Sequence, residues 1–229
     1  MYHNTKGIVL NSIKYAETSI ISKVYTLEFG LQAYIVNGVR KKNGKSTYYQ
    51  PLTLLDLQVS NSKQGQLHRI KEAKPHYVFN SIPFDILKSS VALFLAEVLN
   101  KCLKEEEKNE QLFLFLKKAI VDLDVSPYNS QFHLSFLILL SKYLGFCPDF
   151  NYQNQLYFDM LNGTFVHEQP KHSNYLSNPK ELVGLIEGRK LKNDEKRIVL
   201  NQLIMYYQTH VETFGKIKSV DVLETILNK

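Results

Sequence analysis

The chain has 229 residues, of which 28 are lysine or arginine and 22 are aspartate or glutamate, so its formal net charge is +6. Hydrophobic residues make up 44% and charged residues 22%, which excludes a disordered, collagen-like or disulfide-scaffold chain. We therefore expect a globular protein of one large or two small domains.

The excess positive charge lies in the first third of the chain. Residues 1–80 hold 11 basic and 4 acidic side chains, a charge of +7, whereas residues 81–229 hold 17 basic and 18 acidic ones, a charge of −1. A basic module joined to a neutral one indicates that the first module contacts a polyanion or a membrane surface.

Targeting and membrane signals are missing from the sequence. Its start lacks the apolar core of a signal peptide, and the stretches Val91–Ala96 and Leu134–Leu140 are far shorter than the roughly 20 residues that cross a bilayer. A cytoplasmic protein without a membrane contact is therefore expected.

The two cysteines, Cys102 and Cys147, form no metal-binding pair, and Cys102 falls in a helical apolar pattern that is typical of a reduced, structural thiol.

The first 80 residues predict short strands. They are rich in β-branched and aromatic residues, and turn signals such as Glu28–Gly30 separate them at the regular spacing of a small barrel or sandwich. The predicted strands are Gly7–Ile13, Ser19–Thr26, Leu31–Val36, Leu52–Val59 and Leu67–Ala73. The polar loop Asn37–Ser46, between the third and fourth strands, carries two glycines and four cations and is the strongest charge cluster.

From Ile82 onward the apolar residues recur at helical spacing. The predicted helices are Phe84–Leu103, Asn109–Asp122, Ser130–Leu144, Pro179–Glu187, Asp194–Thr213 and Ser219–Leu227, with Ser130, Asn178, Asn193 and Ser219 as N-caps. The acidic run Glu105–Glu107 is expected to be a solvated face.

One segment fits neither pattern. Cys147–Val166 predicts a short hairpin with Asn162–Gly163 as its turn, inserted between helices. The expected domains are thus a basic barrel over residues 1–80 and a helical domain over 81–229, with an inserted segment at about 146–177.

Catalytic motifs are nearly absent. Gly44–Ser46 resembles the end of a P-loop, but Val39 stands where that motif needs a glycine, and no helix start follows. His167 and His172 lack the four donors of a zinc site, and His210 is expected to be packed and hydrogen-bonded. We therefore expect no enzymatic activity, no catalytic residue and no cofactor.

The basic loop and the last strand point instead to nucleic acid. Cations that neutralise phosphates, together with aromatic rings on which bases stack, are what single-strand binding needs, and a five-stranded barrel often presents them. The predicted DNA-binding residues are Lys14, Arg40, Lys41, Lys42, Lys45, Tyr48, Arg69, Lys71 and Lys74, with Tyr49, His76 and Tyr77 nearby. A loop that is lysine-rich only for solubility is the alternative, and the uneven charge favours binding.

Basic residues also occur in the helical half, at Lys117, Lys118, Arg189, Lys190 and Lys192. They would extend a nucleic-acid path, although the balanced charge of that half favours an ordinary solvated surface.

Several short motifs follow one another along the chain. In the first half they are Thr5-Lys-Gly-Ile-Val-Leu10, Tyr15-Ala-Glu17, Thr26-Leu-Glu-Phe-Gly30 and Val36-Asn-Gly-Val-Arg-Lys-Lys42. In the second half they are Leu95-Ala-Glu-Val-Leu99, Leu139-Leu140 followed by Leu144-Gly-Phe-Cys-Pro148, and Tyr206-Tyr-Gln-Thr-His210, which leads to Lys218-Ser219 and Leu223. In this order the motifs resemble the bacterial recombination mediator family RecO.

The resemblance implies a non-enzymatic, nucleoid-associated repair protein of the α+β class, with an N-terminal OB-fold β-barrel and a C-terminal α-helical domain. Such proteins bind single- and double-stranded DNA and anneal complementary strands. With RecR they help RecA, a partner reached indirectly, to replace single-stranded-DNA-binding protein. The family contacts the acidic C-terminal tail of that binding protein through its helical domain.

The chain departs from the family at the inserted segment. Many members carry four cysteines there as a zinc site, whereas here Asn151–Gln155 and His167–His172 contain none and Cys147 precedes the turn. The segment is therefore interpreted as a metal-free remnant held by aromatic burial. The residues expected to hold it are Phe150, Tyr152, Tyr157, Phe158 and Phe165.

Two other functions share the same charge pattern. The basic barrel of a protein-binding adaptor would take an acidic protein tail in place of DNA, and an RNA-binding OB-fold protein would differ only in its preferred nucleic acid.

Overall fold

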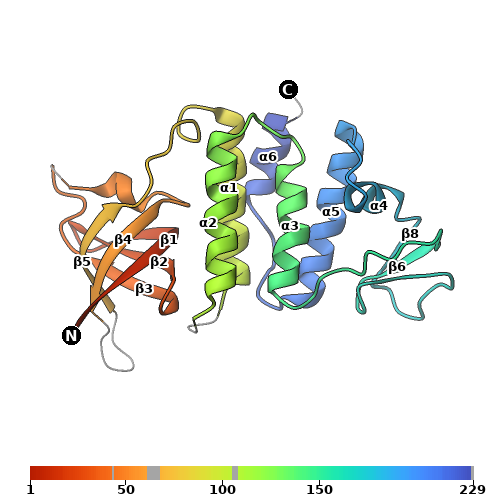
Figure 1. Cartoon of the computed structure of the whole chain (residues 1–229), viewed down its shortest axis with the longest axis horizontal. Helices are drawn as coiled ribbons and strands as arrows, with labels where there is room; N and C mark the ends of the chain where they lie inside the picture. The colour runs from red at the N-terminus through yellow and green to blue at the C-terminus, as the bar shows by residue number, and fades with distance from the viewer. Residues whose placement is uncertain (43, 61–67, 105–107, 228–229) are drawn as a thin grey trace. The chain divides into compact units, whose positions relative to one another are not determined.

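The structure is a computed structural model that describes residues 1–42, 44–60, 68–104 and 108–227 (Figure 1). It divides into two compact units, one of Met1–Tyr128 with Ile217–Leu223 and one of Asn129–Lys216 with Glu224–Lys229. The acidic run 105–107 and the expected first residue of the fifth strand, Leu67, lie outside the described residues.

The first unit begins with a closed five-stranded barrel. Its strands are β1 (Tyr2–Tyr15), β2 (Ser19–Thr26), β3 (Gly30–Val36), β4 (Leu54–Ser60) and β5 (His68–Pro75). They adjoin in the order β1-β2-β3-β5-β4, and the long β1 closes the barrel by pairing with β2 at its end and with β4 at its start. The predicted OB-fold barrel is thereby confirmed.

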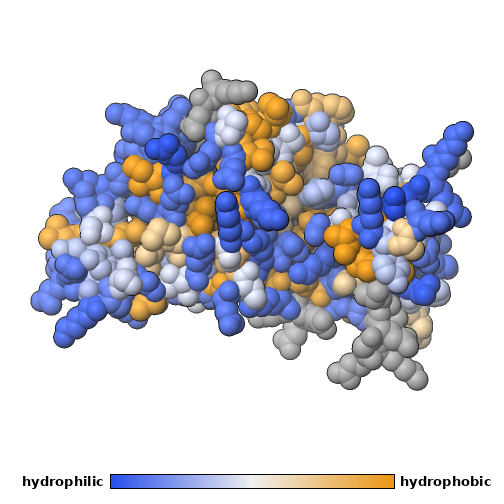
Figure 2. Space-filling view, turned by 180° about the vertical axis from the view of Figure 1, so that it is seen from behind, coloured by the Kyte–Doolittle hydropathy of each residue, from blue (hydrophilic) through white to orange (hydrophobic). Residues whose placement is uncertain are grey.

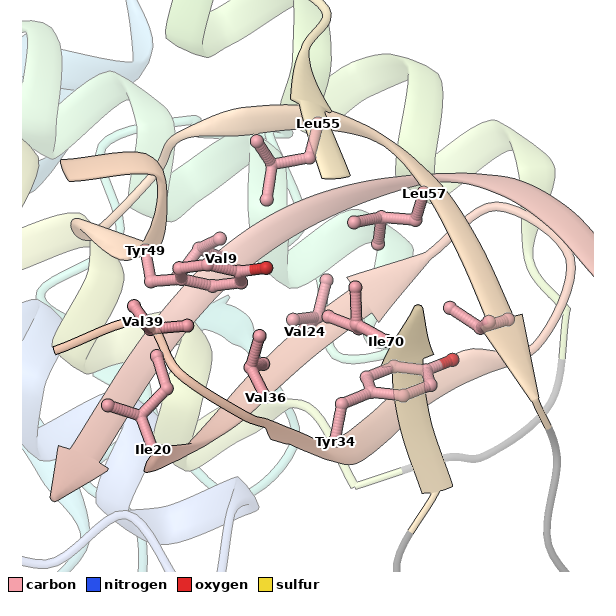
Figure 3. Packing of buried hydrophobic residues seen from close by; sticks show 11 residues of the cluster. Val9, Ile20, Val24, Tyr34, Val36, Val39, Tyr49, Leu55, Leu57 and Ile70 are labelled. Carbon is pink, nitrogen blue, oxygen red and sulfur yellow. The ribbon is translucent and has the colours of Figure 1, made fainter. Parts of the chain in front are cut away.

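Alternation along the strands explains the barrel core. Residues on alternate positions point to the same side of a strand, and Figure 3 shows side chains such as Val24, Tyr34 and Leu57 gathered in one interior. Most of this cluster is β-branched or aromatic, the residue types that favour strands. The β-branched and aromatic residues by which the strands were predicted are therefore those that form the interior of the barrel.

The barrel differs from the expected one at the start of β1. The sequence predicted a strand from Gly7, but β1 begins at Tyr2, and Tyr2–Ile8 pairs with Leu54–Ser60 of β4. Tyr2, His3 and Asn4 are exposed, so these residues show no apolar alternation from which a strand could be recognised.

Helices complete the first unit. They are α1 (Ile86–Cys102), α2 (Glu110–Val125) and the first residues of α6 (Ser219–Leu227). Two side chains of β2 form hydrogen bonds with this helical part. Lys23 Nζ donates to the main-chain oxygen of Asn100 in α1 at 3.3 Å, and Tyr25 Oη donates to the main-chain oxygen of Asn109, just before α2, at 3.5 Å. Part of the outer face of β2 is thus engaged with the helices.

The second unit holds helices and a small sheet. They are α3 (Phe132–Tyr143), β6 (Tyr157–Asp159), β7 (Thr164–Val166), β8 (Tyr175–Ser177), α4 (Lys180–Ile186) and α5 (Asn193–His210). The predicted hairpin is present as β6 and β7, joined through Asn162 and Gly163, whose φ is +66°. The third strand, β8, pairs with β6 and was not predicted.

The aromatic packing expected in the insertion is largely present. Phe158 and Phe165 are buried with their ring centroids 5.0 Å apart, and Tyr152 contacts Phe165 at 5.3 Å. Tyr157 packs on Tyr175 instead. The expectation was wrong for Phe150, which is 51% exposed.

Three predicted N-caps were wrong by one residue. The caps of α3, α4 and α5 are Gln131, Pro179 and Lys192. The predicted residues have other roles: Ser130 accepts from Lys196, Asn178 adopts a φ of +54°, and Asn193 lies inside a helix whose start is held by Glu195.

Candidate nucleic-acid interface

The basic loop after β3 is anchored at both ends in the barrel core. Val39 is 5% exposed and Tyr49, in the short 3₁₀ helix Ser46–Tyr49, is 6% exposed. Between these anchors Arg40, Lys41 and Lys45 are exposed, as is Lys42. Burial of two apolar side chains therefore presents the four predicted cations to solvent.

The two glycines give this loop its shape. Gly38 has a φ of +71°, and a Cβ on Gly44 would lie 1.9 Å from the main-chain oxygen of Val39. The amide of Gly44 also donates to the main-chain oxygen of Lys41 at 2.7 Å. The loop is thus a tight turn that only glycine permits at residue 44.

A cavity of about 370 Å³ lies between this loop and β5. It forms because β3 and β5, within the residues that the structure describes, pair at Tyr34–His68 and Ile35–Arg69 and then separate. Three predicted DNA-binding residues line it, namely Lys45 from the loop and Lys71 and Lys74 from β5. Glu72 is the acidic residue of the lining, so the net charge of the cavity is positive.

Two other predicted residues lie toward the β1–β2 turn. The guanidinium of Arg40 donates to the main-chain oxygen of Ala16 at 3.2 Å, and its amide donates to that of Thr18 at 3.0 Å. Lys14 is exposed on β1 just before this turn. The predicted set is therefore divided between the cavity and the neighbouring turn, with the loop connecting them, while Arg69 lies on β5 outside the cavity lining.

Aromatic rings accompany two of the cavity lysines. Lys45 Nζ lies 5.5 Å from the ring centroid of Tyr48, and Lys71 Nζ lies 4.9 Å from that of Tyr2. Tyr49, which the sequence suggested as a stacking ring, is buried in the core, and this burial raises its pKa. Tyr2 was missed because its strand was not recognised, although it is 55% exposed.

Residues just beyond β5 have structural roles. His76 Nδ1 lies 3.1 Å from a carboxylate oxygen of Asp56, and the hydroxyl of Tyr77 donates to Asp124 at 2.8 Å. These two residues were expected near the nucleic-acid site, and both are engaged with carboxylates.

A second cavity of about 410 Å³ lies on the barrel where β1, β4 and β5 adjoin. Its lining includes Glu28, Asp56 and Glu72 against Lys6 and Lys74. Because its acidic groups outnumber its cations, it suits a polyanion less well than the first cavity does. Figure 2 shows that hydrophilic side chains cover most of the barrel on the side seen there.

The inserted segment does not offer the donor set of zinc. Among the described residues no group of three or more His, Cys, Asp and Glu side chains could hold a metal ion. The inserted segment contains one pair of such side chains, in which His172 Nε2 lies 3.3 Å from a carboxylate oxygen of Asp159. That carboxylate already accepts from the amides of Leu161 and Asn162. The loss of the zinc site stays a prediction.

Cys102 and His210 are placed for packing. Cys102 is buried, and this burial raises the pKa of its thiol to about 12, so the thiol is unreactive at neutral pH. His210 stacks on Phe146 with centroids 4.9 Å apart and lies within 2.8 Å of the main-chain oxygen of Met160, which confirms its expected structural role.

None of the helices in the described part of the chain is long and apolar enough to cross a membrane.

Comparison with known proteins identifies the family of the chain. A family model described as Recombination protein O N terminal matches residues 1–79, and one described as Recombination protein O C terminal matches residues 83–219. A protein named DNA repair protein RecO from Flavobacterium psychrophilum is 37% identical over 240 residues, and one from Flavobacterium johnsoniae is 38% identical over 241. Another from Phocaeicola vulgatus is 34% identical over 244 residues, and each of the three alignments covers all of both chains. The chain therefore belongs to the RecO family of DNA repair and recombination proteins.

Proposed function

We propose that the chain binds single-stranded DNA through its basic barrel, anneals complementary strands, and with RecR helps load RecA onto DNA coated by single-stranded-DNA-binding protein. The observation that carries this proposal is the cavity between the basic loop and β5, where Lys45, Lys71 and Lys74 converge. Double-stranded DNA is a second ligand of the same surface, and the protein acts at the nucleoid.

Electrostatics explain why such a cavity would bind DNA of any sequence. Lysines that neutralise phosphates release condensed counterions, so the affinity falls steeply as salt rises and depends little on base sequence. The exposed Arg40, Lys41 and Lys42 continue the positive surface beside the cavity. Annealing follows because two strands whose phosphates are neutralised repel each other less.

The mechanism proposed here is one of binding, without a covalent step. The charged groups of the cavity are three lysines, which can hold anions, and one glutamate, and together they supply no activated nucleophile. We infer that the helical half contacts the acidic tail of single-stranded-DNA-binding protein, which rests on the family alone.

Single-strand binding by a cavity variant tests the proposal. Replacing Lys45, Lys71 and Lys74 with alanine should weaken binding of a labelled oligonucleotide in fluorescence anisotropy. It should also reduce the slope of log affinity against log salt by about 2, since about 0.7 counterion is released per phosphate of a single strand. Annealing of complementary oligonucleotides should slow in parallel.

A matched control keeps the same change in net charge. Lys171, Lys180 and Arg197 are exposed cations of the second unit, and their replacement with alanine should leave affinity, salt slope and annealing unchanged. An unchanged salt slope in the cavity variant would remove the cavity from DNA binding. Competition by RNA or by an acidic peptide that exceeds competition by DNA would favour an RNA-binding protein or an adaptor instead.

A further inference from the structure

A row of outward-facing side chains runs across the barrel next to the proposed DNA cavity. The strand registers place Tyr2 of β1 opposite Ser60 of β4, Ser60 opposite Arg69 of β5, and Arg69 opposite Ile35 of β3. Because residues opposite each other in neighbouring strands point to the same face of a sheet, these side chains form one continuous row.

The neighbours of the row in sequence show which face it occupies. Val59 lies beside Ser60, Ile70 beside Arg69 and Val36 beside Ile35, and all three of these neighbours belong to the buried core. Figure 3 shows Ile70 and Val36 in that core. Side chains alternate along a strand, so the row faces outward. Tyr2 is 55% exposed and Arg69 is also exposed.

An irregularity in β5 brings a cation to Tyr2. The register passes from Gln58–Glu72 to Val59–Ile70, which leaves Lys71 as an extra residue without an opposite partner. Such a bulge changes the direction of a side chain, and Lys71 Nζ lies 4.9 Å from the centroid of the Tyr2 ring. A carboxylate oxygen of Glu72 is 4.0 Å from the same ammonium, an exposed ion pair of low energy.

This arrangement has the two parts that single-strand binding needs. A ring on which a base can stack stands beside a cation that can hold its phosphate, and Arg69 follows along the row. Lys71 also lines the cavity between the basic loop and β5, so the row and the cavity share a residue.

We propose that Tyr2 is a base-stacking residue for single-stranded DNA, with Lys71 and Arg69 holding the adjoining phosphates as the strand crosses β4 and β5. This inference rests on the proposed DNA binding and specifies the form of DNA. Stacking on a side chain requires an unpaired base, so Tyr2 contributes to single-strand affinity and not to duplex affinity.

The absence of tryptophan from the chain allows a direct test. Tyr2→Trp introduces a single tryptophan, whose fluorescence should be quenched by oligo(dT) as its bases stack on the indole. Phe150→Trp is the matched control, because Phe150 is 51% exposed in the second unit. Quenching of the first variant alone supports the proposal. Equal quenching of both, or of neither while DNA is bound, overturns it.

Affinities provide a second readout. Tyr2→Ala should weaken oligo(dT) binding by about ten-fold, within the usual effect of losing one stacked base, and leave duplex binding within two-fold. Tyr2→Phe, which keeps the ring, should restore single-strand affinity. An equal loss for single strands and duplexes would contradict stacking. Failure of the unaltered protein to bind oligo(dT) would instead refute the proposed function, so the two failures are distinguishable.

Discussion

Lys88 donates a hydrogen bond of 2.8 Å from its ammonium to the main-chain oxygen of Asp124, while the carboxylate of Asp124 holds the chain that leads out of the barrel. The carboxylate accepts from the Tyr77 hydroxyl at 2.8 Å and from the amides of Asn80, Ser81 and Ile82 at 2.8, 2.8 and 2.9 Å. One acidic residue at the end of α2 therefore fixes the connection between β5 and α1.

Asp124→Ala should lower the free energy of unfolding by about 3 kcal/mol, because the Tyr77 hydroxyl and three amides lose a buried, charged acceptor. Urea denaturation measures this loss. Asp122→Ala is the control, since Asp122 makes only an exposed ion pair with Lys118 and should cost less than about 1 kcal/mol. Equal losses in the two variants would show that Asp124 does not hold the connection.

A second carboxylate predicts how stability depends on pH. Glu97 of α1 accepts from the amides of Lys218 and Ser219 at 2.9 and 2.8 Å and from the Ser219 hydroxyl at 2.6 Å, which holds the start of α6. Burial by itself raises the pKa of Glu97, but the hydrogen bonds from Ser219 and Lys218 outweigh it, and the pKa lies below its usual 4.5.

A carboxyl group whose pKa is depressed by folding stabilises the protein above its unfolded pKa, and that stability is lost as the pH falls through the folded pKa. Glu97→Gln should therefore be less stable than the unaltered protein at pH 7, by about 1 kcal/mol for a charged acceptor. The difference should shrink below pH 4.5. Denaturation at several pH values, with exposed Glu168→Gln as the control, measures it; a constant difference would contradict the assignment.

The shape of the basic loop predicts a substitution that acts without changing charge. Gly44→Ala would place a Cβ 1.9 Å from the Val39 oxygen, so the loop must rearrange. We expect a loss of roughly 2 kcal/mol in stability and weaker single-strand binding. Gly145→Ala is the comparison, because Gly145 has a φ of +85° with nothing within 4 Å of its Cβ. It should cost about 1 kcal/mol and leave DNA affinity unchanged, whereas equal DNA affinity in both variants would show that the loop shape does not matter.

The sequence predicted the barrel well because its strands alternate between a buried and an exposed face. The predicted bounds of Ser19–Thr26 agree with those of β2, and the predicted turn at Glu28–Gly30 leads from β2 into β3, which begins at Gly30. The two strand segments that the sequence did not predict, the start of β1 and β8, have little apolar alternation or length by which a strand could be recognised. Tyr2–Lys6 is mostly polar and pairs with β4 far along the chain, and β8 has only three residues. Such elements are determined by partners distant in sequence.

The sequence predicted the cations of the candidate site and Tyr48, but it did not predict how these residues are arranged in space. Lys45 and Lys71 share a cavity because β3 and β5 separate after the Ile35–Arg69 pair, and no local sequence pattern shows this. Tyr48 and Tyr49 look equivalent in sequence, yet Tyr49 is buried in the core while Tyr48 lies under the Lys45 ammonium. Tyr2 joins the site through a bulge in another strand.

The inserted segment gives the last prediction. Asp159 is 6% exposed, and its carboxylate joins the turn after β6, through the amides of Leu161 and Asn162, to His172 in the segment before β8. We expect this carboxylate to hold the segment together without a metal ion. The purified protein should contain no stoichiometric zinc, and a chelator should leave its melting temperature unchanged.

Asp159→Ala should then destabilise the second unit by about 2 kcal/mol, because two amides and a histidine lose their acceptor together. Asp149→Ala is the control, since Asp149 is exposed and accepts only from the amide of Asn151. Metal analysis and thermal denaturation show whether a metal ion or the Asp159 carboxylate holds the segment. One equivalent of tightly bound zinc, or a melting temperature that falls on chelation, would mean that a metal holds this segment and that the Asp159–His172 pair is secondary.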